Sequence, residues 1–327
     1  MNLLTTDEIR RFEVDGYLAV EGVFDPESDF KVLKREYSEI LDSAAAKLLA
    51  DGEIESYDPS LPFEERVMEI VRQTGGLNVQ PFDISLPQKG IGGDTPMYLG
   101  RGAFDLMRHP PLIDLVEQLI GPEVYSNPVQ HIRMKVPERL GRPDSAATKP
   151  GIPGIARSTR WHQDSGVVTQ DADETNMLTV WVPVNDATAE RGCLGVVPGS
   201  HRNSLVGHCP TSGGPTIPDN FIEQDDMAPV PLPAGSVLFL TRYTMHRSLP
   251  NMSDTLRWSF DLRYQPIGQP TGRAVFPGFV VKSKMRPSSV LSDHGEWASL
   301  WERARDDLAS GDEPSFNRWS ADAPWCA

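Results

Sequence analysis

Cysteine is scarce in this sequence, and its placement argues against two kinds of site. The chain has 327 residues but only three cysteines, Cys193, Cys209 and Cys326, and no pair has the C-x-x-C spacing. An odd number of cysteines without such spacing argues against a disulfide framework and against a cysteine-ligated zinc site. Free cysteines are typical of a reducing compartment, so the sequence predicts a cytoplasmic location.

Positive charge and long apolar runs are also lacking. Lys and Arg number 31 against 46 Asp and Glu, and the net charge of −15 argues against a nucleic-acid partner, because such binding neutralises phosphates with basic side chains. No apolar run approaches the ~20 residues that span a bilayer, so no membrane partner is expected. The first residues carry no basic region and no long apolar stretch, so no secretory signal is expected either. The composition, 39% hydrophobic and 24% charged, is that of a globular protein.

The first 120 residues of the sequence show mainly helical patterns. Thr5-x-x-Glu8 is a capping box that opens a short helix. Asp25-Pro26 is a second helix start, followed by apolar pairs that recur every turn or two up to Gly52. In this part we expect helices at 5–12, 26–52, 63–71, 103–107 and 111–120, and a short strand at 16–20.

From residue 124 onward, short β-branched runs alternate with Pro and Gly, which is typical of strands in a sandwich or barrel. A helix is expected again at 291–308, before a polar and aromatic tail that is either a surface strap or a mobile segment. This order fits a mainly β (α+β) fold with a double-stranded β-helix, or jelly-roll, core and flanking helices. One domain is expected, with a helical buttress (1–122), a jelly-roll core (123–266) and a C-terminal loop, helix and tail (267–327). The expected strands are 129–136, 178–184, 195–197, 236–240, 244–248 and 256–264.

Trp161-His162-Gln163-Asp164, near the middle of the chain, is a candidate metal site. His162 and Asp164 lie on the same side of an extended backbone, because side chains alternate along a strand, and together they can bind one metal ion. His246 is the candidate third ligand. Two imidazoles and one carboxylate leave the opposite face of the metal open, as in non-heme Fe(II) oxygenases. The alternatives are a surface histidine and a loop aspartate, and, for His246, a core histidine on a strand.

Ser248 and Arg257, which both follow His246 in the sequence, suit an anionic cosubstrate. Arg257 follows His246 by eleven residues, and its planar fork can donate two hydrogen bonds to the distal carboxylate of a 2-oxo diacid. Ser248 can donate another to the same carboxylate. Leu256 and Trp258 predict a buried strand, in which an inward arginine needs an anionic partner. The alternative is a solvated arginine on that strand.

Together with further motifs, these residues resemble the phytanoyl-CoA dioxygenase family of Fe(II)/2-oxoglutarate oxygenases over roughly residues 12–265. The resemblance implies a jelly-roll fold, Fe(II) as the metal, and 2-oxoglutarate and O₂ as cosubstrates. It also implies hydroxylation of an unactivated C–H bond of a small organic molecule, with oxidative decarboxylation of 2-oxoglutarate to succinate and CO₂. Related halogenases lack the carboxylate ligand, so Asp164 favours hydroxylation or desaturation over halogenation. The motifs are Trp161-His162-Gln163-Asp164, Thr179-Val180-Trp181, Asn185-Asp186, Gly192-Cys193-Leu194, Pro198-Gly199-Ser200-His201, and His246-x-Ser248 with Arg257.

Further cosubstrate contacts follow from the same resemblance. His131, Arg133 and Lys135 alternate along one predicted strand and therefore share a face. The resemblance implies a 2-oxoglutarate contact at Lys135 and one at His131, and the alternative is the exposed polar face of an edge strand. Trp181 stands where the family has an aromatic residue beside the cosubstrate, and its alternative is ordinary core packing.

Two other functions compete with this interpretation. One is a cupin-like metal enzyme that uses no oxo-acid, which would not need the carboxylate clamp of Arg257 and Ser248. The other is a non-catalytic ligand-binding barrel, against which the complete metal triad argues. Iron-dependent conversion of 2-oxoglutarate to succinate separates both from the main hypothesis.

The segment 133–160 reverses the acidic character of the chain. It is either a solvated loop or an electropositive lip that attracts an anionic ligand. Its basic residues are Arg133, Lys135, Arg139, Arg142, Lys149, Arg157 and Arg160, opposed by Glu138 and Asp144.

Overall fold

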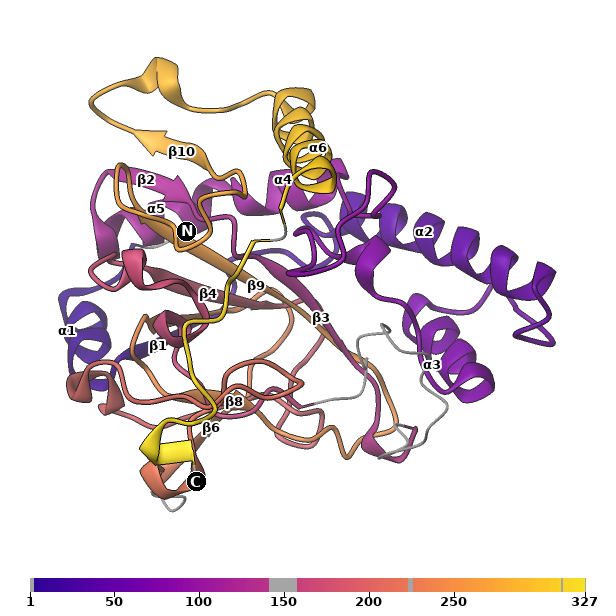
Figure 1. Cartoon of the computed structure of the whole chain (residues 1–327), viewed down its shortest axis with the longest axis horizontal. Coiled ribbons are helices and arrows are strands. Elements are labelled where there is room, and N and C mark those ends of the chain that lie inside the picture. Colours follow the sequence, from indigo (N-terminus) through magenta and orange to yellow (C-terminus); the bar gives the residue numbers. More distant parts are fainter. Residues whose placement is uncertain (1–2, 141–157, 223–225, 313, 327) are drawn as a thin grey trace.

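Two antiparallel sheets form the centre of the computed structural model, which describes residues 3–140, 158–222, 226–312 and 314–326 (Figure 1). The larger sheet has the order β1-β7-β4-β9-β2-β10, with β3 also paired to β9, and the smaller has the order β6-β5-β8. The strands are β1 (Tyr17–Val20), β2 (Glu123–Ser126), β3 (His131–Lys135), β4 (Leu178–Pro183), β5 (Leu194–Val196), β6 (Ala228–Val230), β7 (Val237–Thr241), β8 (His246–Ser248), β9 (Arg257–Pro266) and β10 (Phe279–Ser283).

The two faces of strand β9 contribute to different parts of the protein, one to the hydrophobic core and the other to a pocket. Its apolar residues Trp258 and Phe260 pack on the helical side, where Tyr37 lies 5.2 Å from the ring of Trp258. Because side chains alternate along a strand, Arg257, Asp261 and Arg263 project from the opposite face. Those three residues line a pocket between the sheets.

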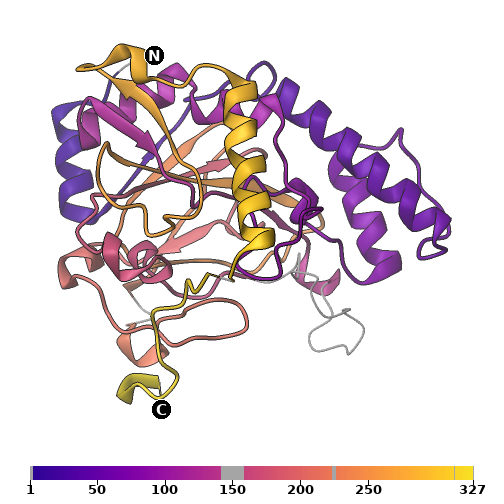
Figure 2. The same cartoon turned by 45° about the horizontal axis from the view of Figure 1, so that its top comes forward.

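The helices pack against the larger sheet. Figure 1 shows α2 and α3 together on one flank, whereas α1 lies beside β1 at the other. In Figure 2, α6 crosses in front of the sheet, next to α4, and the rings of Phe104 and Trp297 meet there with centroids 5.5 Å apart. The helices are α1 (Thr6–Asp15), α2 (Lys31–Ala50), α3 (Phe63–Thr74), α4 (Arg101–Met107), α5 (Pro110–Ile120) and α6 (His294–Ser310). None of the helices in the described residues is long and apolar enough to cross a bilayer.

The jelly-roll prediction with flanking helices is confirmed, and the capping box at Thr5 forms as expected. The second helix starts later than predicted, at Lys31, because the Asp25 side chain accepts hydrogen bonds from the Glu27 backbone N–H and the Ser28 hydroxyl in a preceding turn. Strands β2, β6 and β10 were not predicted from the sequence. The single-domain organisation stays a prediction.

The sequence argues against a disulfide framework, but one disulfide forms. Cys209 and Cys326 are bonded across 117 residues of sequence, and Cys193 is free and buried. Spacing rules detect clustered cysteines and give no signal for two that a fold brings together from such a distance. The cytoplasmic prediction therefore loses its main argument and stays only a prediction, since disulfides are rare in reducing compartments.

The described part of the C-terminal tail is a strap. Arg318 forms a two-pronged ion pair with Asp173, one contact of which measures 2.9 Å. Trp319 donates from Nε1 to the Gly166 carbonyl at 2.6 Å and stacks on His208 with ring centroids 5.0 Å apart. Of the two alternatives for this tail, the surface strap is the one that forms, and it is fastened to the segment just after Asp164.

Candidate active site

His162, Asp164 and His246 converge as the spacing predicted. One ligand atom from each lies within 4.8 Å of the others, and all three residues are buried. His162 and His246 are antiparallel partners, each donating its backbone N–H to the other's carbonyl at 3.0 Å. Asp164 opens the short 3-10 turn that follows. The edge of the smaller sheet therefore fixes the separation of the two imidazoles.

The tautomers of both histidines suit a metal. Nδ1 of His162 lies 2.8 Å from the Arg160 carbonyl, and Nδ1 of His246 lies 3.0 Å from the Thr244 carbonyl. A carbonyl can only accept, so each Nδ1 carries the hydrogen and each Nε2 keeps its lone pair. Burial also lowers the pKa of His162 to about 3, with a further contribution from His246. His162 is therefore neutral at physiological pH, as metal binding requires.

Asp164 is held by two partners that the sequence analysis missed. Arg263 on β9 donates from one Nη to Oδ1, and the Thr179 hydroxyl on β4 donates to Oδ2. Oδ2 is also the oxygen nearer to His246, 3.9 Å from its Nε2. Burial alone would raise the pKa of Asp164, but the charge of Arg263 and the two histidines hold it well below its usual range. A signal was present, because Arg263 follows Arg257 by six residues and therefore shares its face of the strand.

Gln163, between the two ligands, points away from the site as strand alternation requires. Its side-chain amide donates to the carbonyls of Ser204 and Tyr243, both at 2.7 Å. Its backbone N–H donates to Nε2 of His208 at 3.1 Å. These contacts lock the backbone that carries His162 and Asp164.

Arg257 is a buried cation that forms no ion pair with any described residue. It is 2% exposed, its guanidinium lies 5.5 Å over the ring of Trp181, and one of its Nη atoms donates to Ser259. Its Nε is buried with no hydrogen-bond partner among the described residues. Burial lowers its pKa to about 10, so it remains charged near neutral pH. A buried charge of this kind is costly unless a ligand neutralises it.

Lys135 and Ser248 complete the surroundings of Arg257. Lys135 is the cross-strand partner of Arg257, and its Nζ donates to the Ser248 hydroxyl at 3.1 Å and to the Ser158 hydroxyl at 2.7 Å. Burial and the neighbouring charge of Arg257 lower the pKa of Lys135 to about 7. These three side chains could together hold a carboxylate.

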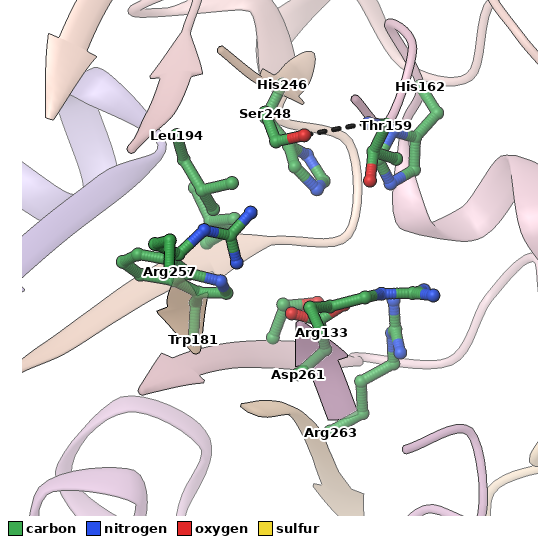
Figure 3. Close-up of a pocket in the computed structure, with 12 residues that line it drawn as sticks. Arg133, Thr159, His162, Trp181, Leu194, His246, Ser248, Arg257, Asp261 and Arg263 are labelled. Carbon is green, nitrogen blue, oxygen red and sulfur yellow. Dashed lines mark hydrogen bonds and ion pairs between the residues drawn. The ribbon is translucent and has the colours of Figure 1, made fainter. Parts of the chain in front are cut away.

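Two histidines and three arginines line opposite sides of one pocket (Figure 3). Figure 3 shows His162, His246 and Ser248 facing Arg257, Arg133 and Arg263 across it. A second cavity, of about 370 Å³, shares Thr159 and Ser248 with it. That volume falls within the usual range for ligand pockets.

Other candidates from the sequence lie differently. Trp181 and Arg133 line the pocket, whereas Nδ1 of His131 pairs with Asp83 at 2.9 Å and His131 does not line it. Arg160 lines the second cavity. Arg139 pairs with Asp254. Arg142, Lys149 and Arg157, and with them the middle of the basic segment, lie outside the described residues.

Comparison with known proteins decides the family. The model of the family described as phytanoyl-CoA dioxygenase (PhyH) matches residues 12–259. The chain belongs to the phytanoyl-CoA dioxygenase family. The family resemblance predicted from the sequence is confirmed, and His162, Asp164, His246 and Arg257 all fall within the matched residues.

Curated relatives agree with this assignment, and a solved structure shares the fold. The chain is 27% identical over 268 residues to phytanoyl-CoA dioxygenase domain-containing protein 1 of Danio rerio, covering 79% of this chain and 88% of the relative. It is 28% identical over 267 residues to ectoine dioxygenase of Bordetella parapertussis, covering 76% and 71%. The fold is similar to that of the non-heme monooxygenase ThoJ, with a TM-score of 0.56, 17% identity and coverage of 92% and 98%.

Iron and 2-oxoglutarate, the cofactor and cosubstrate of this phytanoyl-CoA dioxygenase-family protein, fit the residues present. Three buried ligand atoms are turned towards one point, two of them imidazole lone pairs. The orphaned charge of Arg257 offers a site for a carboxylate. The protein is therefore an Fe(II)/2-oxoglutarate-dependent oxygenase.

Proposed function

We propose that the protein hydroxylates an unactivated C–H bond of a small organic molecule, while 2-oxoglutarate is converted to succinate and CO₂. The observation that carries this proposal is the presence, at one pocket, of a two-histidine, one-carboxylate cluster and a buried arginine that forms no ion pair with the described residues. The names of two relatives support it: an ectoine dioxygenase and a 1-deoxypentalenic acid 11-beta-hydroxylase.

Each residue has a role in this proposal. His162, Asp164 and His246 hold Fe(II), which with 2-oxoglutarate supplies the activation of O₂ and the transfer of one oxygen atom to carbon. Arg257, Ser248 and Lys135 bind the far carboxylate of 2-oxoglutarate, and the ring of Trp181 flanks it. The buried walls of the pocket exclude water from the reacting groups.

A substrate screen tests the proposal. Purified protein with Fe(II), 2-oxoglutarate and O₂ should release succinate and yield a product heavier by one oxygen atom. Succinate formation that is lost without iron separates this function from a cupin-like enzyme that uses no oxo-acid and from a non-catalytic barrel. A product lighter by two hydrogen atoms would instead indicate desaturation.

The low pKa of Lys135 predicts that 2-oxoglutarate binding depends on pH. With a pKa of about 7 in the empty site, Lys135 is charged below that pH and neutral above it. A bound carboxylate favours the charged form, so binding above pH 7 must take up a proton, and affinity should fall by up to roughly tenfold per pH unit. Calorimetric titration of the Zn(II)-loaded protein between about pH 6.5 and 8.5 measures this. Lys135→Met should flatten the profile, and an equally steep profile in that variant contradicts the assignment.

The contact between Arg263 and Asp164 predicts a loss of metal affinity in Arg263→Met. Removing a nearby cation should by itself strengthen metal binding, but loss of the Oδ1 contact frees the carboxylate to rotate. We expect the second effect to dominate, with an affinity for Co(II) reduced roughly 10- to 100-fold, as measured by competition with a chelator.

Two variants accompany Arg263→Met. Arg263→Lys, which keeps the charge, should recover part of the metal affinity. Arg66→Met removes another buried arginine, paired with Asp42 at 2.5 Å and remote from the site, and should lower the melting temperature without changing metal affinity. Co(II) affinity that is unchanged or higher in Arg263→Met contradicts the positioning role.

A further inference from the structure

Three arginines line the metal pocket, and two of them already have a function there. Arg263 pairs with Asp164, and Arg257 is assigned to the far carboxylate of 2-oxoglutarate. Arg257 and Arg263 are also buried, whereas the side chain of Arg133 is 43% exposed. Arg133 is therefore the pocket arginine that an incoming molecule reaches first.

The guanidinium of Arg133 has one edge engaged and another edge free. Its Nε donates to Asp261 at 2.8 Å, across the pairing of β3 with β9. Its two Nη atoms have no hydrogen-bond partner among the described residues, whereas Arg263 uses both of its own, on Asp164 and on the Val129 carbonyl. Asp261 thus holds the side chain in place without consuming the edge that binds carboxylates in two-pronged fashion.

Arg133 lines the same pocket as His162, His246 and Arg257. Its charge contributes to the lowered pKa of Arg257, and the charge of Asp164 contributes to the raised pKa of Arg133. Burial would lower its pKa, but the carboxylate of Asp261 raises it, so Arg133 stays cationic at any physiological pH. Once 2-oxoglutarate occupies Arg257, Arg133 still presents a positive charge to the remaining space of the pocket.

We propose that Arg133 binds a carboxylate of the substrate, so that the protein oxidises an organic acid. This inference rests on the proposed oxygenase function and adds the class of substrate. Because Arg133 lines the same pocket as His162 and His246, the oxidised carbon lies near the acid group and not at the far end of a long chain.

Matched acids and amides test the inference directly. The probes are benzoate and cyclohexanecarboxylate, each compared with its primary amide, titrated into protein loaded with Zn(II) and N-oxalylglycine, a 2-oxoglutarate mimic. We expect both acids to bind at least tenfold more tightly than their amides. Arg133→Met should weaken acid binding roughly 10- to 100-fold, the usual value of a hydrogen bond to a charged group, and Arg133→Lys should recover part of it.

Two controls make the result specific. Arg139→Met removes a basic residue of the same segment that pairs with Asp254 and does not line the pocket, and it should leave acid binding unchanged. The affinity for N-oxalylglycine should change less than threefold in Arg133→Met.

Three results would overturn the inference. The first is that the acids bind no better than their amides, or do not bind at all, and the second is that Arg133→Met leaves acid binding unchanged. The third is an equal loss of N-oxalylglycine binding in Arg133→Met, which would assign Arg133 to the cosubstrate. Failure of the wild-type protein to bind N-oxalylglycine would instead contradict the proposed function. The acid and amide titrations of the Zn(II)-loaded protein alone would then still decide the role of Arg133.

Discussion

Replacing His246 or His162 by alanine should abolish succinate formation and weaken iron binding. Each variant removes one of three ligand atoms that lie within 4.8 Å of one another. Two remaining protein ligands hold a labile divalent ion poorly, so we expect a loss of metal affinity larger than the roughly 10- to 100-fold typical of outer-shell changes. Metal analysis of the purified variants and a succinate assay at saturating iron measure the two effects.

A matched histidine variant shows whether the loss is specific. His294 lies near α4, where its Nε2 bonds the Leu99 carbonyl at 2.7 Å, far from the pocket. His294→Gln should keep wild-type iron content and activity. If His162→Ala or His246→Ala keeps them as well, the assignment of the metal triad is wrong.

Arg257→Ala should raise the apparent KM for 2-oxoglutarate while leaving iron binding nearly unchanged. Loss of a buried, two-pronged charge partner costs roughly 2–5 kcal/mol, which corresponds to about 30-fold and upward in affinity. The bond from Lys135 to Ser248 survives in the variant, so part of the carboxylate site remains. Steady-state kinetics with 2-oxoglutarate varied, at saturating iron and with a fixed substrate, measure the change.

Arg273 provides the control for this variant. It is also buried, and burial lowers its pKa to about 10, but its contacts are the carbonyls of Gly272 and Val167. Arg273→Ala should lower the melting temperature and leave the KM for 2-oxoglutarate within threefold of wild type. A KM for 2-oxoglutarate that also stays within threefold in Arg257→Ala counts decisively against the clamp.

The sequence could predict those parts of the site in which residue type and short spacing carry the chemistry. His162 and Asp164 are separated by one residue, and strand alternation alone brings their side chains together. Arg257 was recognisable because a charge between apolar neighbours on a buried strand needs a partner. The jelly-roll core followed from the change in pattern after the helical segment.

Other parts depend on contacts between distant segments. Arg263 and Asp164 are 99 residues apart, and only the assembled sheets bring them together. The bond between Cys209 and Cys326 spans 117 residues and has no local signal. At the second helix, Asp25 gave the expected capping signal, but its side chain closes a turn instead of starting α2. The first two contacts depend on the tertiary structure, whereas the turn at Asp25 is a local alternative to a helix start.

The strap also has a consequence for biosynthesis. The backbone that carries His162 and Asp164 is bonded through Gly166 to Trp319, and Trp319 stacks on His208, which accepts the Gln163 N–H. Domains fold while they emerge from the ribosome, with N-terminal segments first. Trp319 lies 153 residues after Gly166, so this fastening of the metal-binding segment can form only after the strands of both sheets have been synthesised.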